Sequence, residues 1–347
     1  MKLGLYLDMR NPQRATESSA LYGQTLDLCE QAEELGVDSV WLSEHHAFAD
    51  GYLPQPLVMA AAIAARTRRV RIGTAVLLAP LRSAALLAEE ASIVDLISRG
   101  RLDLGLGAGY RAAEFALYGL SPDKPLDRLF ERLRDIRALL TEHRVTPAPA
   151  QRPLPIWLGC NGPIGARRAG RAGEHLLSVR RRILRDYVAG LQDAGHDPAG
   201  ARVSGPVNVF LSDDPRRDAS RVAEAYCYLW DSYNTAALEG TGRSAPPTDP
   251  SEALRRGLAG GTTGLLVATP EEAAAQLGAH FRGMPIDTLF TWATVPGLPR
   301  AMTDRHIQAW SSDLATCLRD LSDGPPDAAH SGSLAPADLA RERSDRG

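Results

Sequence analysis

The sequence of 347 residues lacks an excess of basic charge, because 39 lysines and arginines stand against 42 aspartates and glutamates, a formal net charge of -3. A nucleic-acid-binding domain usually carries a basic patch and a high isoelectric point, so we expect no nucleic-acid partner. No run approaches the roughly 18 apolar residues of a membrane span, and the first residues are too short an apolar run for a signal peptide. We therefore expect no membrane partner and a cytoplasmic location.

Cysteine is also scarce. The 4 cysteines, Cys29, Cys160, Cys227 and Cys317, are widely separated along the chain. No CxxC pair or cluster of cysteine and histidine is present, which argues against a disulfide framework and a structural zinc site. We expect reduced, mostly buried thiols and no bound metal.

What the sequence does contain is a regular alternation of short apolar runs and longer amphipathic stretches, repeated about eight times. This pattern is typical of parallel strands joined by helices, and it predicts an α/β fold, a (β/α)8 TIM barrel with insertions. Strands are predicted at 3–7, 39–42, 70–78, 102–106, 156–159, 175–178, 203–211, 264–267 and 288–292. Helices are predicted at 21–35, from Pro56, and at 82–97, 126–140, 165–172, 181–194, 216–237, 270–281 and 301–321.

A doubly wound sheet is the competing architecture. It would place a glycine-rich phosphate turn directly after the first strand, where residues 8–18 instead offer Pro12 and polar side chains. We therefore expect one barrel domain over residues 1–321. Residues 239–262, rich in glycine, proline, serine and charge, predict a mobile insertion that could act as a lid, and residues 322–347 predict a disordered tail.

Candidate chemistry follows the second predicted strand, where Glu44, His45 and His46 stand. In a barrel, side chains at the C-terminal ends of strands surround the active site. Imidazole titrates near neutrality and can give or take a proton, although the residues alone leave open a purely structural pair of histidines.

Two glycine-containing segments also follow predicted strands. Residues 105–110 lack the spacing of a dinucleotide-binding fingerprint, so they indicate either close approach of a ligand to bare backbone or a tight turn. Residues 160–165 lead into a predicted helix, whose first amide groups could bind a phosphate, or they form an ordinary turn. Trp292, at the end of the last strand, is a pocket candidate by its position.

Together these segments resemble the bacterial luciferase-like family of flavin-dependent monooxygenases, over residues 1 to about 320. The likeness is carried, in order, by MKLGLYLDMRNP, EELGVDSVWLSEHHAF, VRIGTAVLLAP, SRGRLDLGLGAGYRAAEFALYG, PIWLGCNGPIGARRAGRAGEHLLS and TPEEAAAQL. The segment YLWDSYN is similar to part of the luciferase alpha subunit, which suggests closer kinship to that subunit.

The resemblance implies a flavin bound across the strand ends, with His45 as the catalytic acid or base. It implies a cis peptide bond between Ala75 and Val76 beneath the flavin ring. The residues implied at the cofactor are Glu44, Ala75, Val76, Gly107, Ala108, Asn161, Gly162, Gly165 and Ser178. The residues implied in the substrate pocket are His46, Leu77, Tyr110 and Trp292.

Two positions depart from luciferase. Gly107 stands where luciferase has a reactive cysteine, and Ala108 replaces a phosphate-binding arginine. Arginines at 180–182 could supply the missing charge. The insertion at 239–262 is shorter than the mobile loop of luciferase, so light emission is not implied.

The resemblance implies a monooxygenase that receives reduced FMN from a separate reductase, because no nicotinamide-binding domain is recognisable. It would use O2, through a C4a-peroxyflavin, to oxygenate a small organic substrate, with two copies of the chain forming a homodimer. One alternative is hydride transfer with the deazaflavin F420, whose longer anionic tail would favour Arg167, Arg168 and the 180–182 arginines. A second alternative is a flavin-binding protein without turnover.

Overall fold

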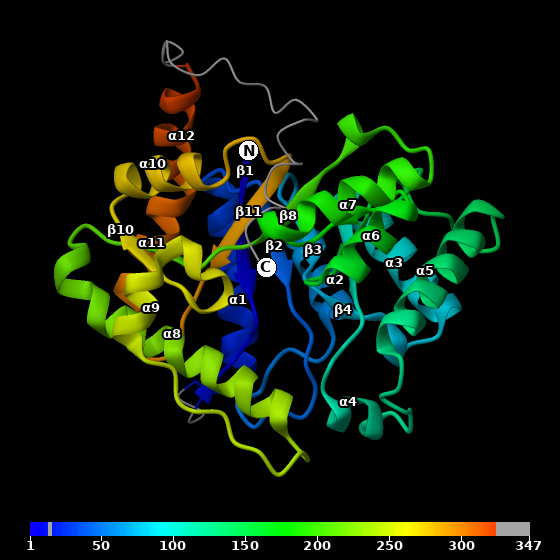
Figure 1. The fold of residues 1–347 in the computed structure, drawn as a ribbon, viewed down its shortest axis with the longest axis horizontal. Helices are drawn as coiled ribbons and strands as arrows, with labels where there is room; N and C mark the ends of the chain where they lie inside the picture. Colours follow the sequence, from blue (N-terminus) through cyan, green and yellow to red (C-terminus); the bar gives the residue numbers. More distant parts are fainter. Residues whose placement is uncertain (13–15, 324–347) are drawn as a thin grey trace, which may run out of the picture.

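A closed ring of parallel strands forms the centre of the computed structural model, which describes residues 1–12 and 16–323 (Figure 1). The main sheet runs β3-β2-β1-β11-β8-β7-β6-β5-β4, and pairing of β3 with β5 closes it. Because β3 and β4 both pair with β5, they share one position of an eight-stranded barrel. The predicted (β/α)8 barrel is confirmed.

The strands are β1 (Lys2–Leu7), β2 (Ser39–Leu42), β3 (Arg71–Thr74), β4 (Leu77–Leu78), β5 (Leu102–Gly107), β6 (Ile156–Gly159), β7 (His175–Leu176), β8 (Val203–Pro206), β9 (Val209–Leu211), β10 (Leu266–Ala268) and β11 (Ile286–Trp292).

Helices surround the ring, and several begin or end as their sequences predict. Pro56 occupies the first turn of α2, and Gly36 follows α1 with a φ of 87°, a conformation that glycine adopts easily. Thr269 and Glu272 form a capping box at the start of α10. The helices are α1 (Ser18–Glu34), α2 (Pro56–Arg66), α3 (Ala84–Ser98), α4 (Ala112–Leu117), α5 (Pro125–Thr141), α6 (Pro163–Arg171), α7 (Arg181–Asp193), α8 (Pro215–Leu238), α9 (Pro250–Arg256), α10 (Pro270–His280), α11 (Arg300–Gln308) and α12 (Leu314–Asp323), the last two joined by a π-helical turn (Ala309–Asp313).

Three predicted elements differ in the structure. The strand expected at 70–78 is divided into β3 and β4, and the strand expected at 203–211 is divided into β8 and β9. Because β9 pairs with β10 in a separate two-stranded sheet, the strand expected at 264–267 lies outside the barrel ring. The expected insertion at 239–262 contains α9 and most of a 3₁₀ segment, Gly257–Thr263.

The predicted tail lies outside the described residues, apart from the end of α12. None of the helices in the described part of the chain is both long enough and apolar enough to cross a membrane.

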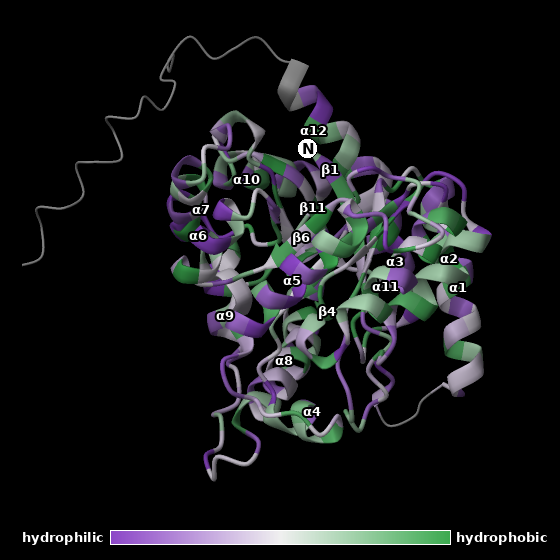
Figure 2. Ribbon diagram, turned by 90° about the vertical axis from the view of Figure 1, so that its right-hand side faces the viewer, coloured by the Kyte–Doolittle hydropathy of each residue, from purple (hydrophilic) through white to green (hydrophobic). Residues whose placement is uncertain are grey.

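The barrel interior is filled by aromatic side chains. Trp41 stacks on Phe290 with ring centroids 4.9 Å apart and an interplanar angle of 16°. Gly73 of β3 leaves room for this stack, since a Cβ there would lie 2.2 Å from the Trp41 ring. Figure 2 shows hydrophobic residues gathered along the central strands and hydrophilic ones mainly on the outer helices.

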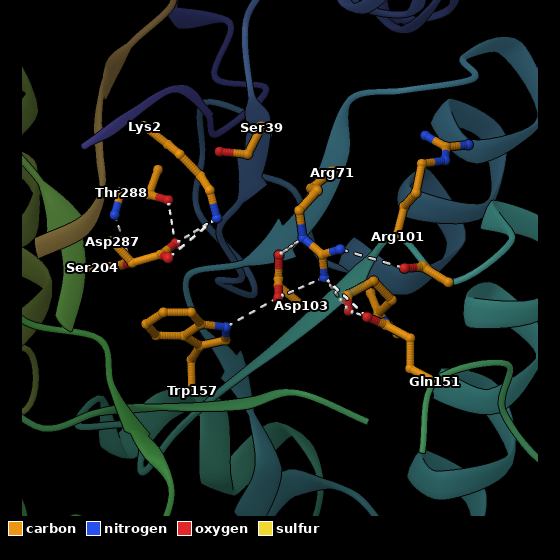
Figure 3. Close-up of polar contacts among 12 residues, drawn as sticks. Lys2, Ser39, Arg71, Arg101, Asp103, Gln151, Trp157, Ser204, Asp287 and Thr288 are labelled. Atoms are coloured by element: carbon orange, nitrogen blue, oxygen red, sulfur yellow. Dashed lines mark hydrogen bonds and ion pairs between the residues drawn. The ribbon is translucent and has the colours of Figure 1, made fainter. Parts of the chain in front are cut away.

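A polar network closes the N-terminal end of the barrel (Figure 3). Arg71 donates two hydrogen bonds to the Asp103 carboxylate at 2.6 and 2.9 Å, and Trp157 Nε1 donates a third at 3.2 Å. Lys2 Nζ lies 3.2 Å from the Asp287 carboxylate. Charged groups at this end therefore meet partners of opposite charge. The first strand begins here, whereas α4 and α8 lie at the opposite end (Figure 1).

Candidate functional site

His45 lies at the C-terminal end of the barrel, directly after β2, and is buried together with Glu114 of α4. His45 Nδ1 and Glu114 Oε1 are 2.7 Å apart, and the same oxygen accepts a hydrogen bond from the His46 backbone N–H at 3.0 Å. A carboxylate oxygen accepts, so Nδ1 is the donor in this contact and Nε2 is the ring nitrogen left for proton exchange. Nε2 has no partner among the described residues. It can therefore take up a proton and return it.

Glu44 and His46 are held by protein groups. His46 Nε2 donates to Glu44 Oε1 over 2.9 Å, while the other Glu44 oxygen accepts from the Leu78 N–H at 2.7 Å. Arg82 also donates to Glu44, at 2.9 Å, and Tyr118 lies 3.3 Å from His46 Nδ1. These contacts connect the end of β2 with β4 and with the segment that leads into α3. The predicted contacts of Glu44 with cofactor and of His46 with substrate stay predictions.

Aromatic rings enclose the His45 imidazole. Ring centroids of Tyr52, Phe48, Tyr110 and Tyr233 lie 4.8, 5.0, 5.5 and 5.7 Å from that of His45. The Tyr52 and Tyr233 hydroxyls are 2.7 Å apart, and burial raises the pKa of both, so they stay protonated at neutral pH. Tyr110, a predicted pocket residue, is 50% exposed at the rim of this group. The surroundings of His45 are thus largely apolar and shielded from water.

Asp8 and Arg10 follow β1 and lie beside this aromatic group. The Arg10 Nε donates to Asp50 at 2.7 Å, and its Nη2 donates to Ser232 of α8 at 2.5 Å. Burial raises the pKa of Asp8 to about 6, although the Arg10 charge opposes the rise. Asp8 Oδ2, Arg10 Nη1, Asp50 Oδ1 and Glu114 Oε2 are buried without a hydrogen-bond partner among the described residues. Such atoms are rare in folded proteins and mark a place where a water or ligand belongs.

The connection between β3 and β4 contains the predicted cis peptide bond between Ala75 and Val76. Tyr6 donates from its hydroxyl to the Ala75 carbonyl at 2.5 Å. The Val76 side chain fills the space beside Gly107 and Gly159, where an added Cβ would lie 2.2 and 2.5 Å from it. Gly107 therefore makes room for Val76, and its predicted contact with cofactor stays a prediction.

The other predicted pocket side chains lie deeper. Leu77 is fully buried in the main hydrophobic core. Ala108, predicted at the cofactor, packs against the same core. Trp292 is buried at the end of β11, with its ring centroid 4.4 Å from that of Tyr6.

Asn161, Gly162 and Ser178 lie together where β6 and β7 end. Ser178 Oγ donates to Asn161 Oδ1 at 3.1 Å. Gly162 precedes α6, whose first turn has no side-chain cap, and a Cβ on Gly162 would meet no atom within 4 Å. There is little space beside Gly165, because an added Cβ there would lie 3.0 Å from the Cys160 side chain. Arg180, at the start of α7, has no anionic partner among the described residues, and burial with the nearby Arg182 lowers its pKa. This turn therefore offers free N–H groups and an unpaired cation.

No three side chains of His, Cys, Asp or Glu are grouped to hold a metal ion within residues 1–12 and 16–323.

Residues 1–288 match the family model described as luciferase-like monooxygenase. The chain belongs to this family. The resemblance in the sequence motifs is thus confirmed for the family, while closer kinship to the luciferase alpha subunit stays a prediction.

Members of the luciferase-like family with different cofactors in their names are similar to this chain. An F420-dependent glucose-6-phosphate dehydrogenase of Amycolatopsis mediterranei is 33% identical over 193 residues, 49% of this chain and 57% of the relative. The oxygenase component of a flavin-dependent trigonelline monooxygenase of Acinetobacter baylyi is 31% identical over 179 residues, 47% of this chain and 50% of the relative. The chain thus spans about half the length of the curated relatives it matches.

The crystal structure of monooxygenase RslO1 from Streptomyces bottropensis superposes with a TM-score of 0.72 at 24% identity, covering 90% of this chain and 98% of that one. This likeness shows the same fold.

Several residues of the site are absent from the sequence-based set. Asp8 and Arg10 directly follow a predicted strand, so the rule that selected His45 could also have found them. Glu114 and Tyr233 lie on helices, far along the chain from His45, and only the folded barrel brings them to it.

Proposed function

We propose that this member of the family is a monooxygenase that takes reduced FMN from a separate reductase and uses O2 to oxygenate a small organic substrate. One oxygen atom would enter the substrate and the other would leave as water, with two electrons supplied by the flavin. The observation that carries the proposal is the buried His45–Glu114 pair with a free Nε2 inside an aromatic enclosure. The relative named as an oxygenase component supports a separate reductase.

The turn before α6 fits the phosphate of FMN. Uncapped N–H groups at a helix N-terminus attract an anion, and the open space at Gly162 would admit one. Asn161 and Ser178 would add hydrogen bonds, and Arg180 would add charge. Bound reduced flavin supplies the electrons for oxygen chemistry.

His45 would control the proton at the reacting centre. Glu114 holds the imidazole in one tautomer, so that Nε2 receives a proton and later donates it. The rings of Phe48, Tyr52 and Tyr233 would exclude water, whose access would otherwise let O2 leave as hydrogen peroxide before it reacts with the substrate.

Hydride transfer with F420 is the second candidate, because several relatives carry F420 in their names. Two of the five arginines expected to favour F420 are already paired within the protein. Arg167 is paired with Asp193 at 2.8 Å and Arg168 with Asp127 at 2.6 Å, so these two arginines are already neutralised within the protein. They are poor partners for the longer anionic tail of F420.

Anaerobic titration with reduced FMN, and separately with reduced F420, tests the proposal. We expect tighter binding of reduced FMN, followed by a transient absorbance change distinct from free FMN oxidation when oxygen is added. Binding of F420 alone would replace the proposal with hydride transfer. Binding of FMN with no effect of the His45→Ala substitution would indicate a flavin-binding protein without turnover.

We also propose that two copies of the chain pair through α2 and α3, which pack side by side. Both helices expose apolar side chains on their outer faces: Val58 is 70% exposed, Leu86 50%, and Ile93 and Ile97 44% each. Exposed apolar patches of this kind usually mark protein interfaces. Light scattering should give the mass of a dimer, and the Ile93→Glu substitution should shift it toward a monomer.

A further inference from the structure

We propose that Asp8 and Arg10 select the polar group of the substrate, and that they prefer an uncharged group of the amide or hydroxyl kind to a carboxylate. The inference rests on the proposed function in one respect, namely that substrate reacts beside His45. It adds a class of substrate and two specificity-determining residues.

The first observation is the concentration of unsatisfied buried atoms at this end of the barrel. Asp8 Oδ2 and Asp50 Oδ1 are acceptors without a donor among the described residues, and Arg10 Nη1 is a donor without an acceptor there. Asp8 is 2% and Arg10 6% exposed, so bulk water does not satisfy them. A ligand with both a hydrogen-bond donor and an acceptor is complementary to this set.

The second observation is that one side of each residue is fixed while the other is free. The Arg10 N–H donates to Asp8 Oδ1 at 3.1 Å, which leaves Asp8 Oδ2 unused. Asp50 and Ser232 hold Nε and Nη2 of Arg10, which leaves Nη1 unused. Each residue is therefore held in place by protein contacts and keeps one hydrogen-bonding position unused, so fewer side-chain rotations have to be fixed when a ligand binds.

The third observation is the position of these groups relative to His45. Tyr52 and Tyr233 each lie with their ring centroid 5.5 Å from the Arg10 guanidinium carbon. The same two rings lie 4.8 and 5.7 Å from the His45 ring. The pair of tyrosines thus contacts both the acid-base candidate and the proposed recognition group, so a molecule held by Asp8 and Arg10 would lie against the apolar surroundings of His45.

The charges around Arg10 decide which kind of polar group the substrate should carry. Two acids, Asp8 and Asp50, surround one base, Arg10, and the Asp50 carboxylate already lies 2.6 Å from the guanidinium. A substrate carboxylate would add a third negative charge and could not donate to Asp8. An amide or hydroxyl would donate to Asp8 and accept from Arg10, which satisfies both atoms without adding charge.

The test uses the full chain without cofactor and three probes of similar size at pH 8. Benzamide has donor and acceptor, N,N-dimethylbenzamide lacks the N–H, and benzoate is an anion with acceptors only. Binding is measured by titration calorimetry or ligand-observed NMR. We expect benzamide to bind at least about tenfold more tightly than either of the others, as the loss of one buried hydrogen bond implies.

The Asp8→Asn variant sharpens the test. It keeps the shape of the side chain but replaces the free acceptor by a donor and removes a charge. The ratio of benzamide affinity to benzoate affinity should therefore fall about tenfold. Asp193→Asn, the same change on α7, should leave the preferences unaltered. Because Asp8→Asn removes a buried charge, the variant should still fold. Its melting temperature checks this.

Discrimination among the probes that disappears in Asp8→Asn supports the inference. Equal preferences in both proteins, or no binding of any probe, would overturn it and leave a buried water as the partner of these atoms. Failure of FMN binding in a separate titration would instead overturn the proposed function.

Discussion

Charged side chains of both signs lie at both ends of the barrel, but the two ends differ in how completely these groups are paired. At the N-terminal end, Asp103 accepts from Arg71 and Trp157, and Lys2 pairs with Asp287 (Figure 3). At the C-terminal end, Asp8, Arg10, Asp50 and Glu114 each leave one polar atom unpaired among the described residues. The hydrogen bonds and ion pairs at the N-terminal end stabilise the fold. At the C-terminal end, the atoms without partners could instead bind a ligand.

The ionisation of the buried Asp8 and the partly buried Asp287 shows the same contrast. Burial raises the pKa of Asp8 to about 6, and the Arg10 charge opposes this only partly. Burial also acts on Asp287, yet a hydrogen bond from Thr288 and the charge of Lys2 hold its pKa below the ordinary value. The opposite signs follow from both the shallower position of Asp287 and its closer donors and cation.

The largest expected effect concerns His45. We expect His45→Ala to slow reoxidation of bound reduced flavin by oxygen about 10²- to 10⁴-fold, because acid-base groups contribute on that scale. FMN affinity should change little. The measurement is stopped-flow absorbance, with His280→Ala on α10 as the control. An unchanged rate would show that this end of the barrel only binds.

A matched pair of substitutions compares the ends directly. The pKa of Asp8 is about 6 in the folded protein against an ordinary value of 3.8, so its ionisation destabilises the fold as pH rises through this window. Asp8→Asn should therefore increase the free energy of unfolding by up to about 3 kcal/mol at pH 8 and by almost nothing below about pH 4. Asp103→Asn should decrease it by about 1 to 3 kcal/mol, since Arg71 loses its anionic partner and one of the two acceptor oxygens is replaced by a donor.

Urea unfolding at pH 8 and at pH 3.5 measures both variants. Changes of the same sign in the two proteins would refute the contrast between the ends.

His306 tests whether a satisfied group near the C-terminal end behaves differently from Asp8. Its Nδ1 accepts from the Leu211 N–H at 2.9 Å, its Nε2 lies 3.2 Å from the Trp292 carbonyl, and burial lowers its pKa to about 4. The stability from neutral His306 should be present above about pH 6.5 and be lost as pH falls toward about 4, by up to about 3 kcal/mol. His306→Gln should flatten this part of the pH dependence, measured by thermal unfolding between pH 7 and 4.5. An unchanged slope would assign it to other groups.

The smallest effect is expected at the phosphate turn. Arg180→Gln should weaken FMN binding about tenfold and change stability by less than about 0.5 kcal/mol. Arg167→Gln, in which the lost cation was already paired with Asp193, should leave FMN affinity unchanged. Fluorescence titration with FMN compares the two variants, and equal losses would mean that general surface charge holds the phosphate.

Much of the fold could be predicted because the period of hydrophobic residues is a local property. The alternation of strands and helices, Pro56 at the start of α2, and the position of His45 after β2 all follow from neighbouring residues. The division of 203–211 into β8 and β9 could not be predicted, because it depends on β10 pairing with one half and β11 with the other.

The barrel class, the family and the position of the histidine after the second strand follow from short segments read in order along the chain. Which side chains meet that histidine depends on the three-dimensional fold. Glu114 fixes its tautomer, Tyr233 reaches it from α8, and Arg10 is held by Ser232, a residue distant in the chain. Hydrogen bonds and charge balance depend on distances in space, and residue spacing along a chain does not contain those distances.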